Sequence, residues 1–159
     1  MIPQLVALAG SPWDVLPPGI HSATLSEVEA RFSYNSPRRA LYGGLVDAAI
    51  YLVQAGCQII LVNGSYVSGN PVPRDFDACW EPNGVDFNKL DPVFGDFADG
   101  RANQKARFGG EFFPSTMIAA DIGAAFPELF QTDRFTGKRK GILSLAISTD
   151  QTVTQRIRQ

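Results

Sequence analysis

The chain of 159 residues has few cysteines, a single histidine and no excess of positive charge. Its only cysteines, Cys57 and Cys79, are too few for a disulfide framework, and neither has a cysteine or histidine partner at zinc-ligand spacing. We therefore expect both thiols to be buried and reduced, as is usual in the cytosol. The net charge of -2 excludes a general basic coat for binding nucleic acid.

Long apolar runs are also absent, because no stretch of the sequence reaches the length that spans a bilayer. The apolar residues near the N-terminus lack the basic start of a signal peptide. We expect a cytoplasmic protein with no membrane partner. With 45% hydrophobic and 19% charged residues, residues 1–159 have the composition of one globular domain that buries its own core.

The clearest predicted element is a helix over residues 36–56. Ser36 is a suitable N-cap, Pro37 suits the first helical position and Gly56 is a natural stop. Apolar residues recur between these ends at helical spacing. A shorter helix is predicted at 24–32, where Thr24 and a glutamate three residues later have capping-box spacing.

The remaining elements are predicted from short apolar runs between turn residues. Strands are expected at 58–63, 75–80, 111–113 and 141–147, and helical turns at 90–97 and in part of 115–131. The rest of the N-terminal segment 1–35 is expected to be irregular, and the polar tail 149–159 to be frayed. Together these elements predict an α+β (α/β) fold in which a small mixed β-sheet is flanked by helices.

The strongest chemical signal is Gly64-Ser65 after a predicted strand, followed beyond a loop by Asp75-Phe76-Asp77. Gly64 lets the backbone approach a phosphate, and Ser65 offers a hydroxyl and an N–H group to phosphate oxygens. Asp75 and Asp77 lie two residues apart on a strand, so their carboxylates point to the same face. Such carboxylates repel each other unless a cation lies between them, and Mg²⁺ or Mn²⁺ prefers oxygen ligands. The pattern therefore predicts a site for phosphate and a divalent metal.

This arrangement resembles the DNA polymerase β-like nucleotidyltransferase superfamily, whose mark is a strand ending in Gly-Ser followed by Asp-x-Asp or Asp-x-Glu on the next strand. The matching segments here are VNGSYVSG at 62–69 and PRDFD at 73–77. Other segments are similar to an uncharacterised group of small prokaryotic nucleotidyltransferase-like proteins. They are LPPGIH at 16–21, TLSE at 24–27, Arg39, QAG at 54–56, FQTDR at 130–134 and KGI at 140–142.

The resemblance implies an enzyme that moves a nucleoside monophosphate from an NTP to a hydroxyl of RNA, such as tRNA, or of a protein partner. Ser65 would hold the β- and γ-phosphates, while Asp75 and Asp77 would bind the metals. Arg74 either contacts the triphosphate or pairs with a nearby carboxylate. Some members of the wider superfamily act as toxins or antitoxins, which implies a cognate toxin or antitoxin as partner.

Members of the superfamily usually carry a third carboxylate on a later strand, facing the same metals. The best match here is Glu111, which would complete the catalytic and metal-binding set by helping to activate the acceptor. The alternative for Glu111 is an ordinary strand residue. Asp121 and Asp99 are the runners-up.

A second hypothesis is a binding module that keeps the nucleotidyltransferase fold without catalysis and acts through contacts with a protein partner. The short chain favours this hypothesis, because larger members of the superfamily add a helical domain that grips the base and the acceptor. A Ca²⁺-binding loop is a weaker alternative, since the DFD segment lacks the ligand series of an EF-hand.

Several other residues have structural interpretations beside functional ones. His21 is expected to be structural, and Tyr66 is expected to pack rather than stack on a base. Arg38 and Arg39 are expected to form exposed ion pairs on the helix. The basic run at 138–140, with Arg134, is either a local RNA-binding patch or a solvated turn. Phenylalanines are expected to fill the core, or else to serve a partner surface, at positions 94, 97, 108, 112 and 113.

Overall fold

The computed structural model describes residues 1–159 and is built around a five-stranded mixed sheet of order β1-β7-β2-β3-β4. The strands are β1 (Gly19–Ala23), β2 (Ile60–Asn63), β3 (Phe76–Trp80), β4 (Gly110–Pro114) and β7 (Gly141–Leu145). β1 pairs with β7 and β3 with β4 in parallel, whereas β2 is antiparallel to both of its neighbours. The predicted α+β fold with a mixed sheet is confirmed.

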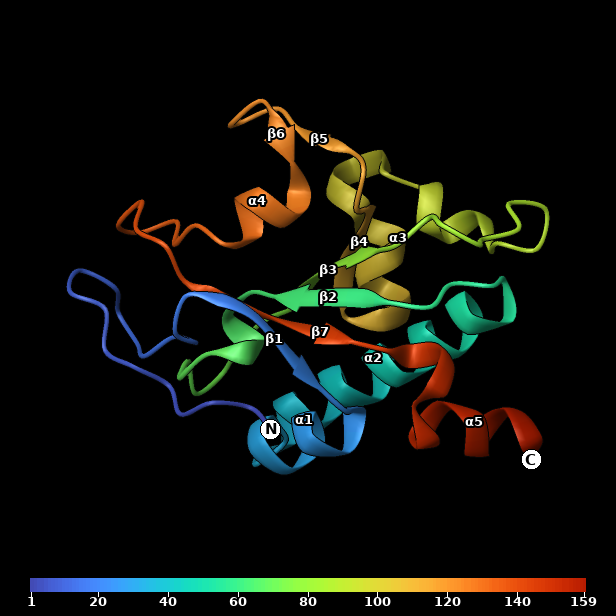
Figure 1. Ribbon diagram of the computed structural model, residues 1–159, viewed down its shortest axis with the longest axis horizontal. Helices are drawn as coiled ribbons and strands as arrows, with labels where there is room; N and C mark the ends of the chain where they lie inside the picture. The colour runs from blue at the N-terminus through green and yellow to red at the C-terminus, as the bar shows by residue number, and fades with distance from the viewer.

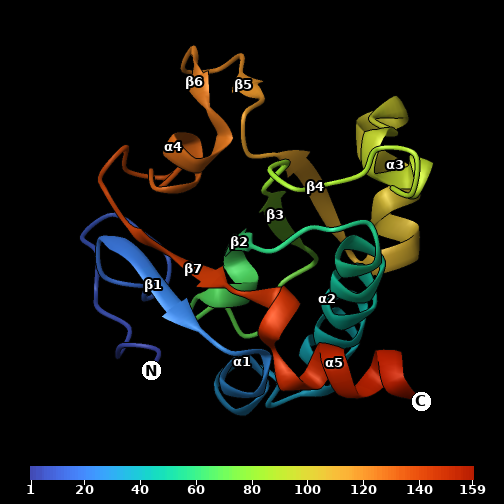
Figure 2. The same cartoon turned by 45° about the vertical axis from the view of Figure 1, so that its right-hand side comes forward.

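Helices cover the two faces of this sheet unequally (Figures 1 and 2). On one side lie α1 (Leu25–Phe32), α2 (Ser36–Gln54) and α5 (Gln151–Arg158). On the other side the regular elements are the small hairpin of β5 (Ile118–Ala119) and β6 (Ala124–Ala125) and the short α4 (Phe126–Phe130). The remaining helix, α3 (Ala98–Phe108), follows the edge of the sheet formed by β4.

Alternation along the strands decides which side chains enter which layer. On β3, Phe76, Ala78 and Trp80 point into the main core of 27 buried residues under α1 and α2. Cys79, on the opposite face of the same strand, belongs to a separate cluster of four buried residues. Both cysteines are buried and free, as predicted, and burial raises the pKa of the Cys57 thiol to about 11.

The predicted long helix is confirmed as α2, with small corrections at its ends. Asn35, not Ser36, is the N-cap, because its side chain accepts the backbone N–H of Arg38 at 3.1 Å. Gly44 allows the close packing of α2 on α3, since a Cβ there would lie 1.7 Å from the carbonyl oxygen of Phe108.

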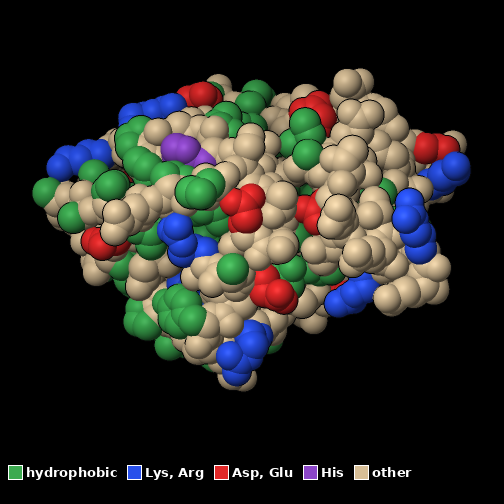
Figure 3. Space-filling view, turned by 60° about the horizontal axis from the view of Figure 1, so that its bottom comes forward, with side chains coloured by type: hydrophobic (Ala, Val, Ile, Leu, Met, Phe, Trp, Pro, Cys, Tyr) green, Lys and Arg blue, Asp and Glu red, His purple; other side chains and the backbone are tan.

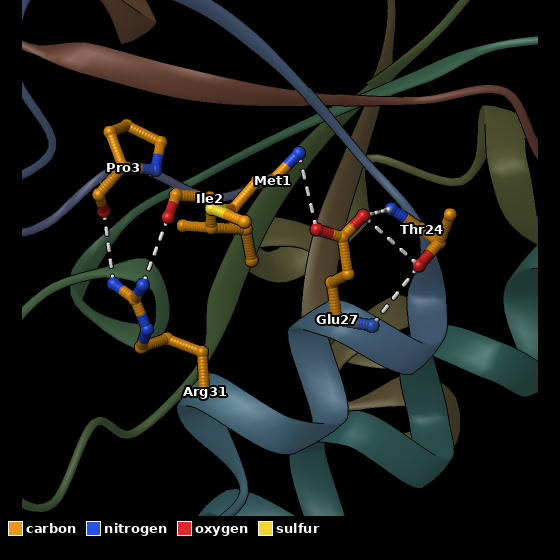
Figure 4. Close-up of polar contacts among 6 residues, drawn as sticks. All are labelled: Met1, Ile2, Pro3, Thr24, Glu27 and Arg31. Carbon is orange, nitrogen blue, oxygen red and sulfur yellow. Dashed lines mark hydrogen bonds and ion pairs between the residues drawn. The ribbon is translucent and has the colours of Figure 1, made fainter.

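The N-terminal residues are fastened to α1 (Figure 4). Thr24 and Glu27 form the predicted capping box at the start of this helix. Arg31 donates hydrogen bonds to the carbonyls of Ile2 and Pro3, both at 2.9 Å. The Met1 amine lies 3.2 Å from the Glu27 carboxylate.

Several sequence-based expectations were wrong. The N-terminal segment, which was expected to be irregular, contains the edge strand β1. Its exposed residue Ile20 is apolar, so β1 lacks the alternation of apolar and polar residues that predicts a strand. The supposedly frayed tail forms α5, because Asp150 caps it and also accepts the backbone N–H of Leu25 at 2.8 Å. Helix α3 was not predicted at all. Two other expectations were confirmed: residues 115–131 are helical in part, at α4 after the β5–β6 hairpin, and 90–97 contains a helical turn, the 3₁₀ turn Pro92–Gly95. None of the helices is both long and apolar enough to cross a membrane.

Candidate functional site

A cavity of about 840 Å³ opens on the sparsely covered face of the sheet. It brings together the predicted site residues Gly64, Ser65, Arg74, Asp75, Asp77 and Glu111. Of the two runners-up for the third carboxylate, Asp121 also lines this cavity, whereas Asp99 does not. Residues that are far apart in the sequence therefore line one cavity.

The Gly64-Ser65 turn lies directly against Asp77. Gly64 has a φ of +97°, and a Cβ there would come within 3.2 Å of the Asp77 Oδ2 atom. Only glycine adopts this conformation readily, and only glycine leaves the carboxylate its space. A 3₁₀ turn, Ser65–Val67, follows and is too short to add a helix dipole. The Ser65 hydroxyl donates to no protein acceptor, so it is available to a ligand.

A buried arginine fixes the shape of this turn. Arg38 is fully buried and donates to the carbonyls of Phe32 at 3.1 Å, Tyr66 at 2.7 Å and Ser68 at 2.9 Å. It also reaches the carbonyls of Ser65 and Asn70. The predicted exposed ion pair of Arg38 is therefore wrong, and only Arg39 is exposed. Arg38, on α2, thus holds the loop after β2 in place from the helix-covered side of the sheet.

The carboxylates line up across neighbouring strands. In the sheet register, Asp77 of β3 pairs with Asn63 of β2 on one side and with Glu111 of β4 on the other. Burial, reinforced by the charges of Glu111 and Asp75, raises the pKa of Asp77 to about 7. The pKa of Asp75, just before β3, is also raised by burial and by Glu111. Mutual repulsion of this kind is expected where carboxylates converge on one site.

Glu111 is less free than the other two carboxylates. Its side chain is only 14% exposed, and its Oε1 atom lies 3.2 Å from Arg101 and 2.9 Å from Lys105, both on α3. Arg101 is held by an unusual backbone, because Asp99, Gly100 and Arg101 all have left-handed φ angles. Both contacts use the same oxygen, so Oε2 of Glu111 is left without a protein partner.

The residues present fit a divalent cation in part. Neither Asp75 nor Asp77 accepts a hydrogen bond that would offset the cost of burying its charge. Hard cations such as Mg²⁺ are held by one or two carboxylates together with waters and substrate phosphates. No group of three or more histidine, cysteine, aspartate or glutamate side chains is arranged to hold a metal ion. The fit therefore rests on the two aspartates.

Cationic side chains surround the same cavity. The Lys140 ammonium donates to the Asn63 side-chain carbonyl and to the Phe130 carbonyl, and burial lowers its pKa to about 8. Arg74 and Arg134 are exposed at the cavity wall. Arg74 forms no ion pair in the structure, so the alternative in which it pairs with a nearby carboxylate is not observed.

The basic run at 138–140 is not one continuous patch. Lys140 points inward, Arg139 pairs with Glu128 at 3.2 Å, and Lys138 donates to the Ala9 carbonyl. On the face presented in Figure 3, acidic and basic side chains are interspersed without a large area of one sign.

The remaining candidates are structural. The His21 Nε2 atom lies 2.7 Å from the Pro17 carbonyl, and Tyr66 is fully buried in the core. Four of the five phenylalanines between 94 and 113 are buried, so they fill the core and offer no partner surface.

Sequence reasoning missed the partners of the carboxylates. Arg101 and Lys105 lie on the unpredicted α3. Asn63 and Lys140 become neighbours only because the start of β7 lies beside the end of β2. The one local signal for Lys140 is its position immediately before a strand.

Of the comparisons with known proteins, one identifies a family, and it covers most of the chain. No curated protein and no solved structure matches the sequence. A family model does match residues 11–146, a range that contains every residue of the cavity described above. The chain belongs to the family of unknown function DUF6932.

Proposed function

We propose that the protein is a metal-dependent nucleotidyltransferase that moves a nucleoside monophosphate from an NTP to a hydroxyl of RNA or of a protein partner. The observation that carries this proposal is the contact between the Gly64 turn and the Asp77 carboxylate, with Asp75 beside them in one cavity. The support is that the Gly64-Ser65 turn lies next to two carboxylates that have no counter-charge in direct contact.

Each side chain has a physical role in this proposal. The free hydroxyl of Ser65 donates to a phosphate oxygen, and Arg74 and Lys140 balance the charge of the triphosphate. Asp75 and Asp77 would hold the divalent cation. A bound divalent cation neutralises phosphate charge and makes the attacking hydroxyl more acidic. The acceptor hydroxyl attacks the α-phosphorus of the NTP and pyrophosphate leaves, while Glu111 on β4 accepts the hydroxyl proton through its unpaired oxygen.

The test is transfer of label from each α-³²P-NTP, with Mg²⁺ or Mn²⁺, to total tRNA or to the product of a neighbouring gene. We expect transfer by the wild type and transfer slower by about 100-fold or more by Asp77→Asn. Asp47→Asn is the matched control, because Asp47 is an exposed aspartate on α2, outside the cavity. Absence of transfer from all four nucleotides would contradict an enzymatic function.

A second candidate is a binding module that keeps this fold without catalysis. The observation in its favour is that Glu111 is occupied by Arg101 and Lys105 and that no three-ligand metal cluster is formed. Calorimetry separates the two candidates. An enzyme requires heat on titration with an NTP and Mg²⁺ and loss of that heat in Asp77→Asn, whereas the module requires neither.

A further inference from the structure

The cavity has an aromatic end that the proposed function does not use. Trp13 and Phe135 both line it, and their rings meet edge to face with centroids 5.7 Å apart. The guanidinium of Arg134 lies 4.8 Å from the centre of the Phe135 ring. Phe135 is 47% exposed, and neither ring belongs to the two core clusters. At the cavity wall Trp13 is half-buried and Phe135 is exposed, and both lie outside the packed cores.

The two rings are held by loops that are tied to each other. Lys138 donates to the Ala9 carbonyl at 3.2 Å, and the turn before it is closed by Asp133, which accepts the Thr136 hydroxyl at 2.7 Å. A Cβ on Gly10 would lie only 3.0 Å from the Thr136 side chain. The loop that carries Trp13 is therefore packed against the loop that carries Phe135.

The same aromatic loop is connected to the phosphate-binding turn. The backbone N–H of Gly69, in the loop after Ser65, donates to the Asp14 carbonyl at 2.8 Å. Val6 and Val15 form a two-sided bridge that closes the loop holding Trp13. The aromatic end and the polar end of the cavity are thus joined by backbone contacts and are preorganised for a single ligand.

We propose that Trp13 and Phe135 form a stacking platform for the nucleobase of the NTP, with Arg134 beside it. This inference rests on the proposed function, because the phosphates of the same nucleotide would occupy the Ser65 end. Aromatic side chains stack on any base, since every base has a π-face, and arginine adds a cation–π contribution. The cavity volume of about 840 Å³ lies within the range of small-molecule sites.

The chemistry of the platform makes a statement about specificity. The two rings present π-faces to a base rather than groups that read its edge, although the side-chain amide of Asn70 also lines the cavity. Stacking without such contacts tolerates all four bases and favours the larger purines. We therefore expect ATP and GTP to bind more tightly than CTP and UTP, by less than about 10-fold.

The experiment compares a nucleotide with its phosphates alone. Titrate the wild type, Trp13→Ala and Phe135→Ala with ATP and with inorganic tripolyphosphate, each with Mg²⁺, by calorimetry. We expect each variant to weaken ATP binding by about 10-fold and to leave tripolyphosphate binding unchanged. Phe87→Ala is the control, because Phe87 is 64% exposed and lies outside the cavity.

Fluorescence provides an independent readout. Trp13 and the buried Trp80 are the two tryptophans of the chain, so the emission that ATP quenches should disappear in Trp13→Phe. Tripolyphosphate should not quench it. Trp13→Phe keeps an aromatic ring, and we expect its ATP affinity to stay within about 3-fold of the wild type.

The outcomes separate this inference from the function on which it rests. If tripolyphosphate binds but the alanine variants leave ATP binding unchanged, the platform is overturned and the phosphate site stands. Equal weakening of both ligands would indicate a general structural effect and would also overturn the platform. If the wild type binds neither ligand, the proposed function fails and the platform fails with it.

Discussion

The two faces of the sheet are built from the same five strands, but one packs apolar side chains and the other holds polar and charged ones. The face under α1, α2 and α5 packs 27 buried residues into one continuous core. The other face has an apolar cluster of only four buried residues, beside a row formed by Asn63, Asp77 and Glu111. Alternation along each strand separates the two sets of side chains, so one face supplies stability and the other is free to hold charge.

The difference between the faces shows where the fold contains a group that lowers its stability. A buried carboxylate without hydrogen bonds destabilises a fold, and such a group persists only where the surrounding structure is stable enough to hold it. Asp77 lies within one residue of Phe76 and Ala78, both fully buried on the helix-covered face. The packing of the helix-covered face therefore offsets the destabilisation caused by the buried charge on the other face.

Asp77→Asn should separate activity from stability most strongly. Removing one charged group that stabilises the transition state lowers the transfer rate by about 100- to 1,000-fold. Because the substitution also removes an unpaired buried charge, the free energy of unfolding should stay the same or rise. Label transfer and denaturant unfolding of the same preparation measure both quantities. A clear loss of stability would mean that this carboxylate is a structural group.

Arg38→Met should instead lower the free energy of unfolding, because Arg38 lies on the packed side of the sheet. It leaves several buried carbonyls of the loop after β2 without a donor, at a cost of about 3 kcal/mol or more in the free energy of unfolding. Denaturant unfolding at one pH measures this change. Arg39→Met is the matched control, since this exposed neighbour should cost less than about 0.5 kcal/mol. Similar values for the two variants would contradict the role assigned to Arg38.

The pH dependence of stability should reveal the charged face. The pKa of Asp77 is about 7 in the folded protein, above the ordinary value of 3.8, so the folded state binds its proton more tightly than the unfolded chain. The stabilising contribution of the protonated group is complete below pH of about 4 and is lost as the pH rises through about 7.

In metal-free buffer, the free energy of unfolding should therefore fall between pH 5 and 8 more steeply in the wild type than in Asp77→Asn. Denaturant titrations at four pH values across this range measure the slope. Mg²⁺ should restore stability at pH 8 in the wild type alone. Parallel profiles for the two proteins would show that Asp77 is ionised at low pH in the folded state.

Arg101→Gln should have the smallest effect on stability. Its ion pair with Glu111 is partly exposed, so the free energy of unfolding should change by less than about 1 kcal/mol. Removing one of the two cations that contact Glu111, with Lys105 still in place, should nevertheless strengthen Mg²⁺ binding several-fold, measured by calorimetry. Arg107→Gln on the same helix removes a similar pair with Asp91 outside the cavity and should leave Mg²⁺ binding unchanged. Unchanged binding in both variants would mean that Glu111 is an ordinary strand residue.

Local sequence patterns were sufficient for the elements whose ends carry their own signals. The capping box at Thr24, the Gly-Ser turn and the alternating strand with Asp77 were predicted from neighbouring residues, and the structure confirms the elements. Helix α3 was missed because its start has three left-handed residues, and α5 because Asp150, its cap, also bonds to distant Leu25. Elements that depend on contacts between residues far apart in the sequence cannot be predicted from a local pattern.

The sequence by itself determined that Gly64 and Ser65 end a strand and that Asp75 and Asp77 share a face, because backbone geometry relates residues only a few positions apart. Only the tertiary structure decided which groups meet them. Strand order placed Glu111 beside Asp77, burial turned Arg38 inward, and loop packing brought Trp13 to Phe135. These neighbours are set by the packing of a whole core, which no short segment encodes.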